Sequence, residues 1–309
     1  MLKKVFIACL FINFIGLNAQ IDTTSVPNVI SNTPGLVADT NSLLDGLEDE
    51  EIDYVSNTFK GTRVINSQSI EMLGKANMDY RISHRFGTLD GGLYTLYGLD
   101  QAYQRMSFTF GLSDLVNIEI GRSSVKKVYD GTIKWKMMRQ ATNKKLNALS
   151  IVYVGNIALQ TEKQPQYKDL AFENKLYFTH QFLIARKFNE KLSLQIMPTI
   201  VHRNFIDSAK YKNTVISLGA TGRYKLTRKL AITGEYFYVF PNQISDRYKN
   251  SASIGVDIET GGHVFQLHLT NSTGMNEKGF IAETENSWLK NQIHFGFNIS
   301  RVFYIGRNR

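Results

Sequence analysis

The chain has 309 residues, a formal net charge of +9, five prolines and a single cysteine. Because that cysteine, Cys9, lies in an apolar N-terminal segment, the exported chain is expected to lack disulfides, thiolate metal sites and cysteine nucleophiles. The basic residues are spread along the chain and form no nucleic-acid motif, so their charge predicts attraction of anionic solutes or lipid headgroups, or simply solvated loops, and no nucleic-acid partner.

Residues 1–19 are typical of a secretory signal peptide. Lys3 and Lys4 precede an apolar run, and the small Ala19 precedes the expected cleavage at Gln20. The run is shorter than the roughly 20 apolar residues that a transmembrane helix needs. We therefore predict export, with a retained helical anchor as the alternative.

Residues 20–57 are rich in small polar residues and end in the acidic run Glu48, Asp49, Glu50 and Glu51. This composition predicts a flexible, acidic periplasmic leader. The acidic run is interpreted as a solvated tail, with two alternatives: a docking patch for a periplasmic partner, or a segment that enters a basic lumen. Residues 59–73 are less clear, and the sequence leaves open whether they form an extra strand or fold into the lumen.

From about residue 75 the apolar residues recur at every second position. Phe295, Phe297 and Ile299, for example, alternate with His294, Gly296 and Asn298 near the C-terminus. Such alternation over repeated segments of about ten residues is typical of membrane β-barrels. The predicted strands cover 77–85, 105–112, 115–121, 132–137, 146–159, 174–187, 191–204, 213–226, 229–240, 250–259, 262–271 and 290–304.

The fold class is therefore all-β, and residues 58–309 are predicted to form a transmembrane antiparallel β-barrel in the bacterial outer membrane. The strand number is expected to be about twelve, within a range of about 10–14. Short connections such as 113–114 and 189–190 alternate with longer ones such as 87–101 and 272–289. Outer-membrane barrels place short turns in the periplasm and long loops outside, which sets the predicted orientation. The alternative is a soluble β-sandwich or barrel.

Charged residues on the strands are expected to face inward, because a charge that faces lipid near the bilayer midplane is costly. Asp79, Arg81, Arg105 and Glu119 come from three consecutive strands and could form a cross-strand ion network. Such a network would either line a selective pore or close a narrow barrel, and the closed interior is favoured at this barrel size. The candidate lumen-lining residues are Asp79, Arg81, Arg105, Glu119, Lys134, Lys136, Arg223, Glu235, Asp257 and His294.

Catalytic and metal-binding motifs are not found in the sequence. The six histidines are scattered, and neither a His-Glu-x-x-His pattern nor a Gly-x-Ser-x-Gly elbow occurs. Ser83 and His84 are neighbours on one strand, so their side chains point to opposite faces and would make a poor hydrolytic dyad. We predict no catalytic residues, no metal site and no cofactor.

Several short stretches resemble one family. Phe59-Lys60-Gly61-Thr62-Arg63-Val64-Ile65-Asn66 and the segment Asp79 to Gly87 are similar to a family of outer-membrane β-barrels of unknown function that is common in Bacteroidetes. The later segments 98–101, 121–124 and 129–131 are also similar to it. The resemblance covers about residue 58 to the end. It implies a barrel in the outer membrane, and it implies no reaction.

The leading functional hypothesis is passage or gated binding of a small solute, for which the net positive charge favours an anion. The first alternative is a closed structural or docking barrel that presents its loops to a partner. The second is an outer-membrane barrel hydrolase. The expected environment is outer-membrane lipid, and the sequence identifies neither the solute nor a partner protein.

Overall fold

A computed structural model describes residues 52–143, 147–163, 170–206, 210–260 and 263–306. The predicted signal peptide and most of the acidic leader lie outside these residues. In the described part, no helix is both long enough and apolar enough to cross a membrane.

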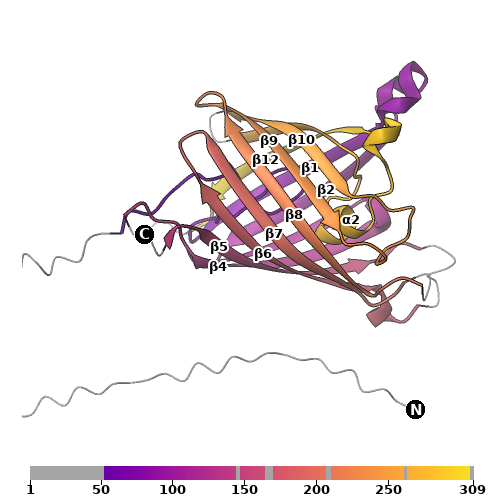
Figure 1. Cartoon of the computed structure of the whole chain (residues 1–309), viewed down its shortest axis with the longest axis horizontal. Coiled ribbons are helices and arrows are strands. Elements are labelled where there is room, and N and C mark those ends of the chain that lie inside the picture. Colours follow the sequence, from indigo (N-terminus) through magenta and orange to yellow (C-terminus); the bar gives the residue numbers. More distant parts are fainter. Residues whose placement is uncertain (1–51, 144–146, 164–169, 207–209, 261–262, 307–309) are drawn as a thin grey trace, which may run out of the picture. The chain divides into compact units, whose positions relative to one another are not determined.

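Twelve antiparallel strands close into one barrel in which each strand pairs with its neighbours in the chain and β1 pairs with β12 (Figure 1). This confirms the predicted fold class and strand number. The strands are β1 (Asn77–Thr88), β2 (Ala102–Gly111), β3 (Val116–Ser123), β4 (Val128–Met138), β5 (Ser150–Gln160), β6 (Leu176–Lys187), β7 (Leu192–Arg203), β8 (Thr214–Lys225), β9 (Leu230–Val239), β10 (Ser251–Thr260), β11 (His263–Thr270) and β12 (His294–Tyr304).

The register follows the apolar alternation, because one face of each strand is apolar and turned outward. Tyr80 lies opposite Phe108 across β1 and β2, and their rings stack with centroids 4.9 Å apart. Ile133, Ile196 and Ile216 are about half exposed on the same outer surface. An apolar exterior on a closed barrel is what lipid requires, since no backbone edge is left unpaired.

Long and short connections mark the two ends of the barrel, with two departures from the predicted series. The β3–β4 connection, expected to be long over 122–131, spans only 124–127 because both strands extend further than the alternation suggested. The β4–β5 connection, at the short-turn end, spans 139–149. Within it, Ala141 pairs with Tyr54 in an isolated bridge, and the Gln140 carbonyl accepts a hydrogen bond from Val55 N–H at 2.9 Å. The end of the leader is thus held at the periplasmic end of the barrel.

Helical pieces lie in the connections of the described residues, and three of them are the short 3-10 helices η2 (Val125–Lys127), η5 (Phe172–Lys175) and η6 (Trp288–Lys290). The 3-10 helix η1 (Leu89–Gly98) follows β1, and the α-helix α2 (Glu277–Ala282) lies between β11 and β12. Asn276 begins α2 as its N-cap, since its side chain accepts a hydrogen bond from Gly279 N–H. Phe280, Ile281 and Ala282 are fully buried, which places α2 against the barrel wall and away from solvent.

Candidate functional site: a filled lumen

Residues 58–73, here called the luminal hairpin, lie inside the barrel, which answers the question that the sequence left open. Val64 N–H bonds to Ser67 and Ser69 N–H bonds to Thr62, so the segment folds back on itself. Lys134 Nζ on β4 donates to the Ser69 carbonyl at 2.7 Å. Inner residues of strands all around the barrel hold the hairpin; further donors to its carbonyl groups are Gln195 on β7, Gln266 on β11 and Asn298 on β12.

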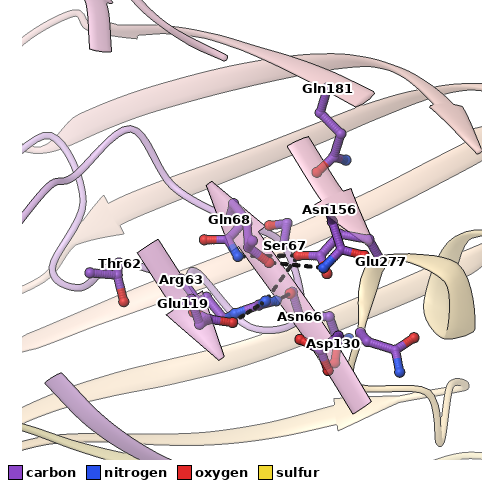
Figure 2. Close-up of polar contacts among 12 residues, drawn as sticks. Thr62, Arg63, Asn66, Ser67, Gln68, Glu119, Asp130, Asn156, Gln181 and Glu277 are labelled. Carbon is purple, nitrogen blue, oxygen red and sulfur yellow. Dashed lines mark hydrogen bonds and ion pairs between the residues drawn. The ribbon is translucent and has the colours of Figure 1, made fainter. Parts of the chain in front are cut away.

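Residues 271–293, here called the outer loop, enter the lumen from the opposite end. Arg63 of the luminal hairpin forms an ion pair with Glu277 of α2, with 2.9 Å between Nη2 and Oε1. Gln68 donates to the same Glu277 oxygen at 3.2 Å. The two segments therefore meet inside the barrel, and Figure 2 shows Arg63 and Gln68 beside Glu277.

An ion-pair network joins the luminal hairpin to the wall. Arg63 also pairs with Glu119 on β3 at 2.8 Å, and Arg105 on β2 pairs with Glu119 at 2.7 Å. Arg105 bonds Asp130 on β4 as well, at 2.5 Å. All four side chains are buried, so the charges are compensated by one another and not by water.

A single carboxylate holds the turn of the luminal hairpin. Glu235 on β9 accepts hydrogen bonds from Asn66 N–H and Ser67 N–H, both at 3.0 Å, and from Ser67 Oγ at 2.9 Å. Asn66 in turn accepts from Arg85 on β1 at 2.8 Å. These charge-assisted bonds cross the barrel from β1 to β9 through the hairpin turn, which fixes its position.

The inner wall divides into two regions, which we call the polar wall and the apolar wall. The polar wall is the inner face of β10–β12 and β1–β4, and it carries the ion network. The apolar wall is the inner face of β5–β9, where Val152, Leu183, Met197 and Phe237 are fully buried. These residues form one cluster with Phe59, Val64, Ile65 and Ile70 of the luminal hairpin and with Phe280, Ile281 and Ala282 of α2.

Each predicted lumen residue has a place in this arrangement. Arg105, Glu119, Lys134 and Glu235 are buried and touch the luminal hairpin or the ion network. Asp79 accepts from Thr62 at 3.2 Å, and Arg81 donates to Gln266 at 2.9 Å. Of the four residues expected to form an ion network, Arg105 and Glu119 pair with each other. The other members of the observed network are Arg63, Asp130 and Glu277.

The remaining predicted residues lie nearer the barrel ends or pair within the wall. Asp257 accepts from Gln266 at 3.0 Å. His294, at the outer end, bonds the Phe86 carbonyl at 2.8 Å and Asn286 at 2.6 Å. Lys136 and Arg223 are only partly buried. That any of the ten lines a solute path stays a prediction.

Luminal residues of two kinds were absent from the predicted set. Arg85 and Asp130 continue the inward parity of their strands, so the alternation alone would have found them. Arg63 and Glu277 lie outside the strands, where no periodicity marks an inward position. The apolar wall also had a signal: runs such as Ile151–Val154 and Phe182–Ala185 are apolar at both parities, which is typical of strands buried on both faces.

Cavities remain at both ends of the barrel. One of about 790 Å³ at the periplasmic end is lined by residues 53–56 and by the β4–β5 and β6–β7 connections. Two smaller ones, of about 150 and 350 Å³, lie at the outer end, and Lys126 and Glu283 line both. Within the described residues, no group of three or more His, Cys, Asp or Glu side chains is placed to hold a metal ion.

Ser83 and His84 are not arranged as a hydrolytic dyad. Ser83 is buried on the inner face, whereas the His84 ring stacks on Phe297 of the outer face with centroids 5.1 Å apart. Adjacent strand residues point to opposite faces, as the sequence reasoning assumed.

Comparison with protein-family models gives a match over residues 59–303 to the family described as a membrane bound beta barrel domain, DUF5777. The chain belongs to this family. The resemblance noted from the sequence is thereby confirmed, and the chain is a barrel of the bacterial outer membrane, surrounded by membrane lipid. Comparison with curated protein sequences gave no match.

Solved structures with a similar fold include outer-membrane channels. The NanC porin is 8% identical with a TM-score of 0.44, and 74% of this chain covers 98% of that one. The KdgM porin is 9% identical with a TM-score of 0.44, and the match covers 74% of this chain and 99% of the porin. The COG4313 outer membrane channel of Pseudomonas putida F1 is 11% identical with a TM-score of 0.45, and the match covers 75% of this chain and 97% of the channel.

Proposed function

We propose that this protein is a gated conduit for a small solute, closed in the present state by the luminal hairpin and the outer loop. The observation that carries the proposal is the ion pair between Arg63 and Glu277, which joins a segment from the periplasmic end to a segment from the outer end. A barrel of this size lies between small filled barrels and large open porins, so what fills the lumen decides whether it conducts.

The chemistry of the closure supports a reversible device. Along the polar wall, the luminal hairpin is held by ion pairs and hydrogen bonds, such as those of Arg63 with Glu119 and of Asn66 with Arg85. A buried ion pair adds little net stability compared with apolar side chains of the same volume. Polar contacts of this kind can be replaced by water or by a charged solute, whereas an interior that only needed filling would be better filled by apolar groups.

The charge of the chain supports an anionic solute, because a net positive protein attracts anions to its surface. We propose no reaction: a gated conduit needs no catalytic group, and the function rests on closure and release alone.

The filled lumen also favours a second candidate, a permanently closed barrel that presents its loops to a partner. Leu93 and Tyr94 in η1 are 77% and 94% exposed at the outer end, which is a surface that a docking partner would cover. Under this candidate the ion network is a fixed structural filling.

Solute flux into liposomes separates the two candidates. Protein purified from outer membranes would be reconstituted as wild type, as Arg63→Ala and as the surface control Arg228→Gln, whose arginine is exposed in a short turn. We expect little flux through the wild type and the control, and rapid flux of small anions through Arg63→Ala. A folded Arg63→Ala barrel that admits nothing would overturn the gated conduit in favour of the closed barrel.

A further inference from the structure

A carboxylate at the outer mouth is held between two lysines. Glu283 Oε2 lies 3.0 Å from Lys126 Nζ, and Glu283 Oε1 lies 3.1 Å from Lys278 Nζ. Each oxygen therefore has its own ammonium partner. Lys126 belongs to the β3–β4 connection, whereas Lys278 and Glu283 belong to the outer loop. The three residues, here called the carboxylate clamp, thus tie the outer loop to the barrel wall.

The wall holds the deeper lysine in place. Lys278 Nζ lies 3.7 Å from the centroid of the Tyr177 ring and donates to Gln160 Oε1 at 2.5 Å. Tyr177 and Gln160 are themselves buried on the inner faces of β6 and β5. A cation over an aromatic face keeps its charge attractive to a carboxylate while it is shielded from water.

Space is present on both sides of the clamp. The cavity of about 150 Å³ is lined by Lys126 and Glu283 together with Arg203, Arg247 and Tyr248. The cavity of about 350 Å³ on the other side is lined by the same Lys126 and Glu283. Cations outnumber carboxylates in the smaller cavity, so its field attracts an anion, and tyrosine rings offer flat apolar surface to the body of a solute.

The charges of the clamp are set for exchange. Burial opposes the charge on Glu283, but Lys278 and Lys126 outweigh it and hold the pKa of this carboxyl at about 2. Burial lowers the pKa of Lys278 to about 8 despite Glu283. Near neutral pH, the ammonium groups of Lys126 and Lys278 therefore face the single carboxylate of Glu283. A second carboxylate can bind these lysines only by displacing Glu283.

We propose that the carboxylate clamp is a binding site for a small solute that carries a carboxylate, which takes the place of Glu283 on Lys126 and thereby frees the outer loop. The inference rests on the proposed gated conduit and names the class of its solute. The solute class follows from the geometry, because the two lysines are already spaced to receive the two oxygens of one carboxylate. Release of the outer loop would in turn remove Glu277 from Arg63 of the luminal hairpin.

The test is a calorimetric titration of the purified, detergent-solubilised protein with D-glucuronate and with D-glucose, which differ only at the carboxylate. We expect glucuronate to bind and glucose not to bind. Lys126→Gln should weaken glucuronate binding about tenfold, as expected for a lost charge-assisted hydrogen bond. Glu283→Gln should strengthen it about tenfold, because the internal competitor is gone. The control is Lys290→Gln, an exposed lysine of the outer loop, which should change nothing.

The opposite signs of the two variants make the proposal easy to overturn. Equal binding of glucose, unchanged binding in Lys126→Gln, or weaker binding in Glu283→Gln with an unaltered circular dichroism spectrum would each contradict it. The binding titration is independent of the liposome flux. Flux through Arg63→Ala without glucuronate binding would contradict only the proposed carboxylate site. Glucuronate binding to a barrel that never conducts would contradict the gated conduit.

Discussion

The polar wall and the apolar wall hold the same two segments by different forces. On β10–β12 and β1–β4 the luminal hairpin meets charges, with Arg63 shared between Glu119 and Glu277. On β5–β9 it meets side chains such as Leu183 and Phe237, which are fully buried. Apolar contacts gain free energy without direction, whereas ion pairs fix orientation and are exchangeable. The apolar wall thus holds the two segments by burial, and in the proposed gated conduit the ion pairs of the polar wall control opening of the lumen.

The largest expected effect comes from breaking the polar wall at its centre. Glu119→Gln leaves Arg63 and Arg105 short of a carboxylate in a buried site, which costs about 3–5 kcal/mol in the free energy of unfolding. The variant should also let ions through at rest. Chemical denaturation and ion flux would measure both. A stable and closed Glu119→Gln barrel would mean that the polar wall is a mere filling.

The matching change on the apolar wall should lower stability without opening the lumen. Leu183→Ala removes a fully buried side chain that packs in the cluster of the luminal hairpin and α2, and it should lower the free energy of unfolding by about 2–5 kcal/mol. Because the ion pairs stay intact, we expect resting flux close to that of the wild type. Flux as large as in Glu119→Gln would erase the difference between the two walls.

The pH response isolates the carboxylate clamp. The pKa of Glu283 is lowered by Lys278 and Lys126 to about 2. Its contribution to docking of the outer loop on the barrel wall is therefore complete above its ordinary pKa of 4.5 and is lost as the pH falls from there toward 2. The pKa of Lys278 is lowered by burial to about 8, so docking strengthens as the pH rises from 8 toward its ordinary 10.5. Arg203 and Tyr248 lie near the clamp as further charged or titratable groups.

Acrylamide quenching of Trp288 fluorescence measures how far the outer loop is exposed to solvent. The measurement is made in a Trp135→Phe background, which removes the other tryptophan of the chain. Quenching should be constant from pH 5 to 8, increase below about pH 4.5 and decrease above pH 8. In Glu283→Gln, quenching should not increase below about pH 4.5, because the carboxyl that titrates there has been removed. An acid increase of the same size in Glu283→Gln would show that another carboxylate controls the outer loop.

The smallest effect is expected from a single methyl group. Ile65 at the turn of the luminal hairpin is buried against the apolar cluster, and Ile65→Val should lower the free energy of unfolding by about 0.5–1.5 kcal/mol with no change in flux. Thermal denaturation would measure it. A change in flux would mean that packing at the hairpin turn, and not charge, sets the gate.

The strands could be predicted because every second residue of a membrane strand must satisfy lipid. Phe108 and Ile133 had to face out, so Arg105 and Lys134 had to face in. What occupies the interior follows no such rule: Arg63 and Glu277 lie outside the strands, in segments that pair across more than 200 positions of the sequence. The position of the luminal hairpin was therefore left open, and the ion network was assembled from strand residues alone. The stretches of β5 and β6 that are apolar on both faces were a further sign that the lumen holds another segment.

The most direct test of the closed lumen is single-channel conductance of the purified protein in a planar bilayer. The wild type should show almost no steady current, and Arg63→Ala should show long openings whose reversal potential in a salt gradient indicates anion preference. Steady current through the wild type would contradict closure by the luminal hairpin and the outer loop. Silence in a verified, folded Arg63→Ala barrel would contradict the gate.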